Sequence, residues 1–372
     1  MRSTIRTIVA AGLMAIGCVS AASAAPPSYY PEDYGKLIEA AKSETSLLIY
    51  SNIGATNWAP IIKAFNAEYP WIKVDTTDMR APEVFERYYA DNATGGKSAD
   101  ILLAAAPQNW MEFFPKNQIL DYVSPEASRV PDWSRPKPGI YTISMDPFVL
   151  AYNKLLLPEA EWPKSMADIV KLVEKSPGKY TNKIGTYAPN ASTYTQGLYW
   201  AVTQRNGEKA YDWFKTLGPI TEPYRATGPV LEKITTGEYL LGYFVVGLNI
   251  IPYVSDPVRA KVIGWALPND AAAVYMRNFA ITRTSKSPNA AKLMTDFLLS
   301  TAGQTQVGIG GLLPYRADVT DPAAFRLGGL SFAKLVESVG EKNLITIDFD
   351  QAMLTGTEAM AKRLDTIFKQ PK

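Results

Sequence analysis

The stretch SLLIYSNIGATNWAPIIKAFNAEYPWIKVD, residues 46–75, decides the fold because it contains a strand, a polar turn, a helix and a second strand in that order. Its apolar run Leu47–Tyr50 is short and continuous, as is typical of a strand buried on both faces of a parallel sheet. Apolar residues then recur at helical spacing between Ala59 and Ala67, and the Tyr-Pro dipeptide after them ends the helix. The turn Ser51–Thr56 is therefore expected either to cap its own helix or to present backbone N–H groups to a ligand oxygen.

The first 24 residues have the pattern of an export signal. Two arginines precede an apolar run, and Ala22-Ser23-Ala24 forms a small-x-small cleavage site. We therefore predict that residues 1–24 are a cleaved signal peptide and that the mature protein is in the periplasm. The alternative is lipidation at Cys18, which would anchor the protein to a membrane, but the lipoprotein box there lacks the usual leucine at its first position. No later stretch reaches about 18 uninterrupted apolar residues.

Composition excludes several classes of site in the mature chain. Cleavage would remove the only cysteine and both early arginines, so the formal net charge falls from +2 to zero and neither Cys nor His remains. This composition excludes disulfides, Cys–His zinc sites, and nucleophiles that are activated by histidine. A neutral chain without a dense basic stripe is also not expected to bind nucleic acid.

Helical and strand patterns alternate along the chain, which predicts an α/β protein with parallel sheets. The expected strands include 47–50, 72–76, 101–104, 183–187, 240–246 and 262–266, and the expected helices include 82–93, 165–175, 194–206, 228–236 and 287–300. A proline-rich stretch leads into the extended apolar run 140–152, which we interpret as a crossing from one lobe to another, with a return crossing around 267–281. The predicted parts are residues 25–144 with 271–330 as lobe 1, 145–270 as lobe 2, and 331–372 as a helical tail packed on the lobes.

The order of the motifs LLIYSN, ADILLAAAP, FVLAYNK, GEYLLGYF and GGLLPYRADV resembles that of the extracellular solute-binding proteins of bacterial ABC importers. The resemblance covers nearly the whole mature chain and lies in the branch that contains the ferric-ion-binding proteins. It implies a two-lobed periplasmic-binding-protein fold of type 2, with two crossover strands as a hinge. It also implies a monomer without cofactor or catalytic role, which closes on a small-molecule ligand and delivers it to permease subunits in the inner membrane.

The resemblance leaves the identity of the ligand open. Ferric-ion binders of this branch use adjacent tyrosines just after the GE-containing strand, but Gly247-Leu248 takes about that place here. The pair Tyr88-Tyr89 lies inside a predicted helix, where neighbouring side chains point about 100° apart, so we expect it to pack in the core. Ferric or another metal ion is thus the alternative ligand, and a secreted hydrolase with a Ser-Lys or carboxylate pair is the second alternative.

Candidate ligand contacts are the polar turns at the ends of strands, because ligands of open α/β sheets bind outside the carboxyl ends of the strands. The candidates in these turns are Ser51, Asn52, Thr56, Gln108, Asn109, Asn190, Ser192, Thr193, Tyr194, Gly247 and Asn249. Arg225 and Arg277 add charge, since a guanidinium can bind a carboxylate or phosphate through two hydrogen bonds. The competing interpretation of both arginines is a solvated residue or a surface ion pair.

The predicted ligand is therefore a small anionic or polar organic solute. A group of carboxylates near the start of the predicted helix 82–93 is interpreted as a solvated face and not as an acid–base pair. These carboxylates are Asp75, Asp78, Glu83 and Glu86.

Overall fold

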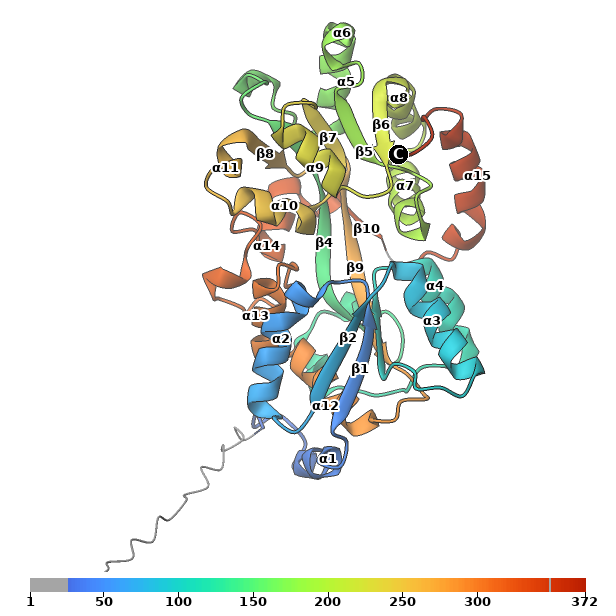
Figure 1. The fold of residues 1–372 in the computed structure, drawn as a ribbon, viewed down its shortest axis with the longest axis vertical. Coiled ribbons are helices and arrows are strands. Elements are labelled where there is room, and N and C mark those ends of the chain that lie inside the picture. Colours follow the sequence, from blue (N-terminus) through green and yellow to red (C-terminus); the bar gives the residue numbers. More distant parts are fainter. Residues whose placement is uncertain (1–25, 348) are drawn as a thin grey trace, which may run out of the picture.

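The computed structural model describes residues 26–347 and 349–372 and contains two α/β lobes joined by long strands (Figure 1). The predicted signal peptide and Cys18 lie outside the described residues. The strands are β1 (Ser46–Ser51), β2 (Lys73–Asp78), β3 (Ile101–Ala104), β4 (Ile140–Asn153), β5 (Ile184–Tyr187), β6 (Thr221–Tyr224), β7 (Leu241–Val246), β8 (Ile263–Ala266), β9 (Ala272–Ile281) and β10 (Leu344–Ile347). The described helices of the lower lobe in Figure 1 are α1 (Tyr34–Ala41), α2 (Ala55–Glu68), α3 (Ala81–Ala93), α4 (Pro107–Phe113), α12 (Pro288–Leu299) and α13 (Thr301–Ile309).

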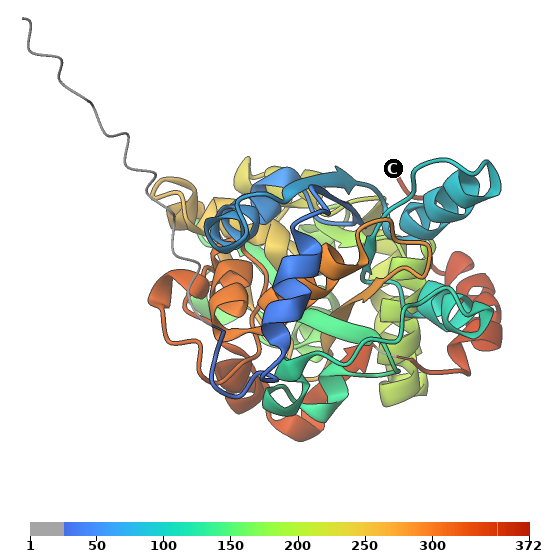
Figure 2. The same ribbon diagram turned by 90° about the horizontal axis from the view of Figure 1, so that it is seen from below.

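The upper lobe contains the middle of the chain. Its helices are α5 (Met166–Lys175), α6 (Pro177–Tyr180), α7 (Thr193–Asn206), α8 (Glu208–Leu217), α9 (Gly228–Thr235), α10 (Gly247–Val254) and α11 (Arg259–Val262). The chain ends with α14 (Phe332–Val339), β10 and α15 (Met353–Asp365). Figure 2, seen from below, shows α1 crossing the lower end of the molecule with other helices on either side of it.

The strands form one continuous path in the order β2-β1-β3-β9-β4-β7-β5-β6. In the lower lobe β1 pairs in parallel with β2 and β3, and in the upper lobe β5 pairs in parallel with β6 and β7. The carboxyl ends of these parallel strands lie toward the junction of the lobes, which is where ligands of open α/β sheets bind.

Two strands belong to both lobes. The first part of β4 pairs antiparallel with β9, and its second part pairs with β7 and β8. Strand β9 also pairs with β3 at one end and with β10 at the other. All fourteen residues of β4 are buried, which explains its long apolar sequence. These are the two crossover strands expected from the sequence, while a hinge motion about them and the residue boundaries of the lobes stay predictions.

Each lobe has its own apolar core. In the lower lobe the spacing of Trp58, Ile61 and Phe65 puts their side chains on the inner face of α2, where the Phe65 ring meets Phe297 of α12 at 5.6 Å. In the upper lobe Tyr199 of α7 meets Phe214 at 5.2 Å. No helix in the described ranges is long and apolar enough to cross a membrane.

The C-terminal tail is not wholly helical, which corrects one expectation. Its strand β10 pairs in parallel with the start of β9, from Leu344 opposite Ala272 to Ile347 opposite Tyr275. Its sequence Leu-Ile-Thr-Ile is short and interrupted by a threonine, so it gives a weak strand signal by itself. Helix α15 follows and packs against α7, where the Trp200 indole donates a hydrogen bond to Asp350 at 2.7 Å.

Candidate functional site

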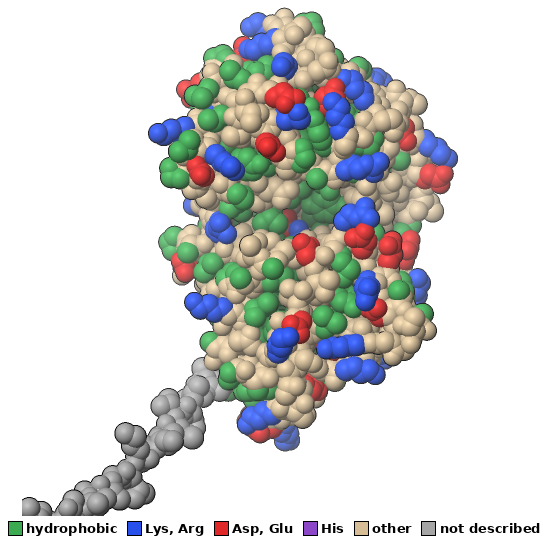
Figure 3. All heavy atoms as spheres, in the orientation of Figure 1, with side chains coloured by type: hydrophobic (Ala, Val, Ile, Leu, Met, Phe, Trp, Pro, Cys, Tyr) green, Lys and Arg blue, Asp and Glu red, His purple; other side chains and the backbone are tan. Residues whose placement is uncertain are grey.

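A cavity of about 690 Å³ lies between the lobes, and Figure 3 shows the surface hollowed at this level. The lower lobe contributes residues after β1 and β2 and from the start of α3, and the upper lobe contributes residues after β5, β6 and β7. The volume is in the range that small-molecule sites occupy. Of the thirteen residues predicted from the sequence, the six that line this cavity are Asn52, Ser192, Tyr194, Arg225, Asn249 and Arg277.

Arg277 lies on β9 in the wall of this cavity and is almost completely buried. Its Nε donates a hydrogen bond to Oδ2 of Asp146 on β4 at 2.8 Å, and the two side chains are only 3% and 2% exposed. Its Nη1 donates to the side-chain oxygen of Asn52. No hydrogen bond within the described part of the chain uses Nη2, so this nitrogen is free to bind a ligand.

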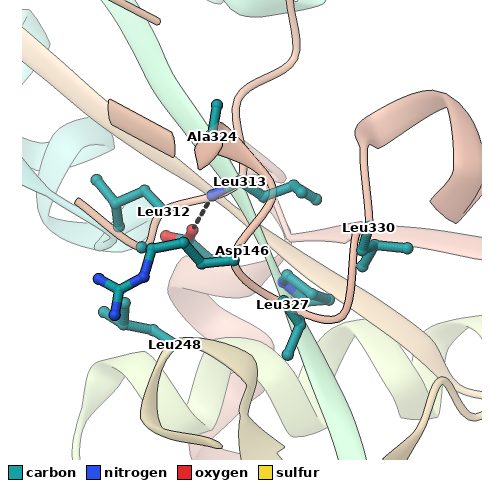
Figure 4. A pocket seen from close by; sticks show the side chains of 10 residues that line it. Asp146, Leu248, Leu312, Leu313, Ala324, Leu327 and Leu330 are labelled. Atoms are coloured by element: carbon teal, nitrogen blue, oxygen red, sulfur yellow. Dashed lines mark hydrogen bonds between the residues drawn. The ribbon is translucent and has the colours of Figure 1, made fainter. Parts of the chain in front are cut away.

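Asp146 is held from behind by further donors. The Ser144 hydroxyl donates to its Oδ2 at 3.1 Å, and the backbone N–H of Leu313 is 3.4 Å from its Oδ1, as the dashed line in Figure 4 shows. Apolar residues such as Leu327 surround a water-sized space of about 10 Å³ beside this carboxylate. Because Asp146 neutralises Arg277, the floor of the cavity offers a fixed hydrogen-bond donor without net charge.

Arg225 differs from Arg277 because it is exposed and unpaired. It follows β6, and its backbone N–H donates to the carbonyl of Lys372 at 3.1 Å. Its guanidinium lines the cavity and makes no hydrogen bond or ion pair with any residue that the structure describes. The surface ion pair considered from the sequence is therefore absent among these residues, and Arg225 keeps its net positive charge toward the cavity.

The start of α7 forms an aromatic wall of the cavity. Ser192 is the N-cap, and its N–H donates to Oγ1 of Thr195 at 3.1 Å. The ring of Tyr194 stacks on Tyr275 at 4.2 Å with an angle of 12° between the planes, and Tyr187 lies 6.0 Å away. Burial raises the pKa of Tyr187 and of Tyr194 above that of a free phenol, so both remain neutral at physiological pH.

Asn249 lies in the first turn of α10 and is anchored to the start of α9. Its Nδ2 donates to Oγ1 of Thr227 at 2.8 Å, which leaves its Oδ1 without a hydrogen bond among the residues described. The first N–H groups of a helix have no partner inside the helix, so the starts of α7 and α10 add backbone donors to the same cavity. The upper lobe therefore presents donors from several elements at one place.

Comparison with known proteins identifies a family for which a ligand cavity between two lobes is expected. A family model described as bacterial extracellular solute-binding protein matches residues 60–327. The chain belongs to this family. Its members are solute-binding components of ABC transporters, so the second alternative, a secreted hydrolase, has no support from the family. The search of the curated proteins gave no significant match.

Solved structures of other solute-binding proteins share the fold. The substrate-binding protein of an ABC transporter from Agrobacterium tumefaciens is 20% identical, with a TM-score of 0.73 over 87% of this chain and 94% of that chain. Iron-bound HitA from Pseudomonas aeruginosa is 19% identical, with a TM-score of 0.67 over 86% of this chain and 99% of that chain. AfuA from Actinobacillus pleuropneumoniae, with fructose-6-phosphate bound, is 18% identical, with a TM-score of 0.65 over 87% and 98%. The predicted periplasmic-binding-protein fold of type 2 is thus confirmed.

Seven predicted residues of this solute-binding protein do not line the cavity. Ser51 is buried, donates to the carbonyl of Ile53 at 3.1 Å and accepts from the Trp58 indole at 2.9 Å. Thr56 is exposed in the first turn of α2, and Asn190 donates to Asp365 in the tail. Ser51 therefore serves local structure, which was the competing interpretation of its turn, and Asn190 ties the upper lobe to the tail.

The remaining four lie at or near the junction of the lobes. Gln108 is buried, and the Thr193 hydroxyl donates to Oδ1 of Asn109 at 3.3 Å, which joins α7 to α4 across the lobes. The turn expected at 105–109 is in fact the start of α4, because its proline is placed in the first helical turn, where proline is well tolerated. A Cβ on Gly247 would be 2.8 Å from the Pro147 carbonyl oxygen, so this glycine permits close packing on β4.

Three charged residues of the cavity were not predicted. They are Asp78 at the end of β2 and Arg80 and Glu83 at the start of α3. Arg80 Nε donates to Glu83 at 2.9 Å, and this hydrogen bond holds the pKa of Glu83 below its usual range. Asp78 is exposed and Glu83 partly exposed, as the solvated-face interpretation expected, but that interpretation did not use the position of these residues at the end of a strand, the signal that led to Asn52.

The residues considered for the alternative metal site lie in the core or are apolar. Tyr88 is completely buried and donates to Gln118 at 2.9 Å, so its assignment to the core is confirmed. Leu248, which the sequence resemblance placed at the position of the tyrosine pair, lines the cavity. In the described ranges no group of three or more His, Cys, Asp or Glu side chains is arranged to hold a metal ion.

Proposed function

We propose that this protein captures a small anionic or polar organic solute in the cavity between its lobes. The solute is then delivered to the permease subunits of an ABC importer in the inner membrane. We further propose that the protein acts as a monomer in the periplasm after cleavage of its signal peptide. The family match supports the role in solute binding, and the details of the cavity support the class of solute.

The observation that carries this proposal is the set of free donors in one cavity. Arg225 has no side-chain partner within the described residues, and Arg277, whose Nη2 is used by no hydrogen bond there, lines the same cavity. The starts of α7 and α10 add backbone N–H groups. Charge-assisted hydrogen bonds to an oxyanion are roughly twice as strong as neutral ones, so a carboxylate or phosphate suits this set of donors.

Ligand that stays bound during purification provides the direct test. The protein is purified without refolding and analysed by mass spectrometry under native and then denaturing conditions. We expect release of a small organic solute that carries an oxyanion or several hydroxyl groups. Release of a metal ion instead, with a visible charge-transfer band after ferric ion is added back, would favour the alternative represented among the structural relatives by iron-bound HitA.

A matched pair of variants locates the site. Arg225→Ala should weaken binding of the recovered solute about ten- to a hundredfold, because a hydrogen bond to a charged group contributes about 1.5–3 kcal/mol. The melting temperature without ligand should stay nearly unchanged, since Arg225 is exposed and unpaired within the described chain. Arg259→Ala on α11 is the control, because this arginine is also exposed but lies outside the cavity lining. If calorimetry gives the same affinity for the solute in both variants, Arg225 does not contact the solute.

A further inference from the structure

We propose that the solute is a zwitterion, with an oxyanion at one end and a protonated amine at the other. This inference rests on the proposed function and specifies its class of solute. It comes from the charged side chains in the cavity wall, which are Asp78, Arg80, Glu83, Arg225 and Arg277. Among the described residues two of them, Asp78 and Arg225, have no partner, and they have opposite signs and belong to opposite lobes.

The other charges of the wall are already paired. Arg80 binds Glu83 through its guanidinium and also through its backbone N–H, at 2.9 Å and 3.0 Å. Arg277 is neutralised by Asp146 behind it. When Asp146 is included, the cationic and anionic side chains at the cavity are equal in number. A ligand with no net charge therefore matches the site as a whole, while its separated charges match the two unpaired residues.

Asp78 provides the acceptor on the lower lobe. It is the last residue of β2, opposite Ser51 of β1, and its carboxylate makes no hydrogen bond or ion pair with the rest of the described chain. Its Oδ2 is 3.4 Å from the position that a Cβ on Gly54 would take, beside the start of the fourteen-residue helix α2. The positive end of a helix stabilises a carboxylate at this place, and Asp78 also belongs to the cavity lining, so its negative charge is available to a solute.

Closure of the lobes makes the pairing of these charges necessary. In the present arrangement Asp78 and Arg225 are exposed, so water solvates both. A closed cleft would remove that water, and a buried charge without a partner is strongly unfavourable. A cavity of about 690 Å³ leaves room for a solute between them, and the rings of Tyr187 and Tyr194 offer a wall for its carbon chain. A solute with an amine and an oxyanion satisfies both residues at once.

Matched probes test the amine separately from the oxyanion. γ-Aminobutyrate is compared with butanoate and butylamine, and O-phosphoethanolamine is compared with ethyl phosphate, by calorimetry on the ligand-free protein. The zwitterions are expected to bind at least tenfold more tightly than the anions that lack the amine. The carboxylate and phosphate series together show which oxyanion the cavity accepts.

Variants then assign the two ends of the probe. Asp78→Asn should remove the preference for the zwitterion and leave affinity for the plain anion unchanged, whereas Arg225→Ala should weaken both. Asp75→Asn is the matched control, because Asp75 lies on the same strand but outside the cavity lining. An unchanged melting temperature of Asp78→Asn shows that the variant is folded.

The outcomes separate this inference from the proposed function. Equal binding of anion and zwitterion, with no effect of Asp78→Asn, overturns the zwitterion and leaves anion capture standing. If none of the probes binds, the inference is tested by the solute released from the purified protein. A solute with both an amine and an oxyanion supports the inference, and a solute without an amine overturns it. Recovery of a metal ion overturns the proposed function itself.

Discussion

Replacement of Asp146 by asparagine tests the buried ion pair at the junction of the lobes. Asp146 and Arg277 are 2% and 3% exposed, so solvent cannot take over the role of either partner. Ser144 and Leu313 donate to different oxygens of Asp146, so asparagine, with its single side-chain oxygen, keeps only one of these acceptors and leaves the Arg277 charge without a counter-charge. Loss of one partner from a buried pair costs about 3–5 kcal/mol. This is a large part of the roughly 5–15 kcal/mol by which proteins are stable.

Urea denaturation followed by circular dichroism and tryptophan fluorescence measures this loss. With an m-value of about 3 kcal/mol/M, the midpoint should fall by about 1–2 M. Glu358→Gln is the control, because its pair with Lys362 has side chains that are 77% and 74% exposed, and such a pair contributes at most about 1 kcal/mol. Combination of Asp146→Asn with Arg277→Met should recover much of the loss. A shift no larger than that of the control would refute the argument that this pair is sealed from water.

Four further measurements check other parts of the structure. Burial raises the pKa of Asp296 from 3.8 to about 6. The contribution of Asp296 to stability is therefore greatest at low pH and falls by about 3 kcal/mol as the pH rises from about 4 to 6. The melting temperature of Asp296→Asn, measured over this pH range, should lack this loss. The hydrogen bond with Arg316 lowers the pKa of Asp318 to about 2, so Asp318 stabilises the fold at neutral pH and loses this effect on acidification. Melting curves of Asp318→Asn should therefore show a smaller loss of stability at low pH. Gly247→Ala should cost about 1–3 kcal/mol in urea denaturation, because its Cβ would be 2.8 Å from the Pro147 carbonyl oxygen. Saturating solute should reduce the radius of gyration in X-ray scattering, and an unchanged radius would contradict the hinge motion.

Some elements with a clear local signal were predicted closely from the sequence. The strand expected at 101–104 is β3 with the same bounds, and the helix expected at 194–206 differs from α7 by one residue. The four residues of β3 are all apolar and buried, and α7 begins directly after the hydroxyl cap at Ser192. The two crossover strands were predicted for the same reason, since the run at 140–152 is apolar almost throughout and becomes β4.

Elements that depend on distant partners were missed. Strand β10 is stabilised by pairing with β9, which is about 70 residues earlier in the sequence, and its own four residues give no periodic signal. Helix α4 was taken for a polar turn because its sequence begins with proline and includes amide side chains. The proline lies where its missing N–H costs nothing, so the same residue that suggested a turn in fact begins a helix.

The same distinction holds for the candidate site. Asn52 and Arg225 follow strands directly, and Ser192 caps the helix after β5, so a local rule was enough to bring them to the cavity. Whether each charged residue is neutralised depends on partners that are distant in the sequence. Asp146 neutralises Arg277 although the two are 131 positions apart. Asp78 and Arg225 have no partner among the described residues. Local sequence signals therefore predict part of the cavity lining, whereas the proposed charge of the solute depends on how the lining side chains pair in the fold. A single added carboxylate partner for Arg225 would change the preferred solute without changing the fold, which is consistent with relatives of one fold that hold iron and fructose-6-phosphate.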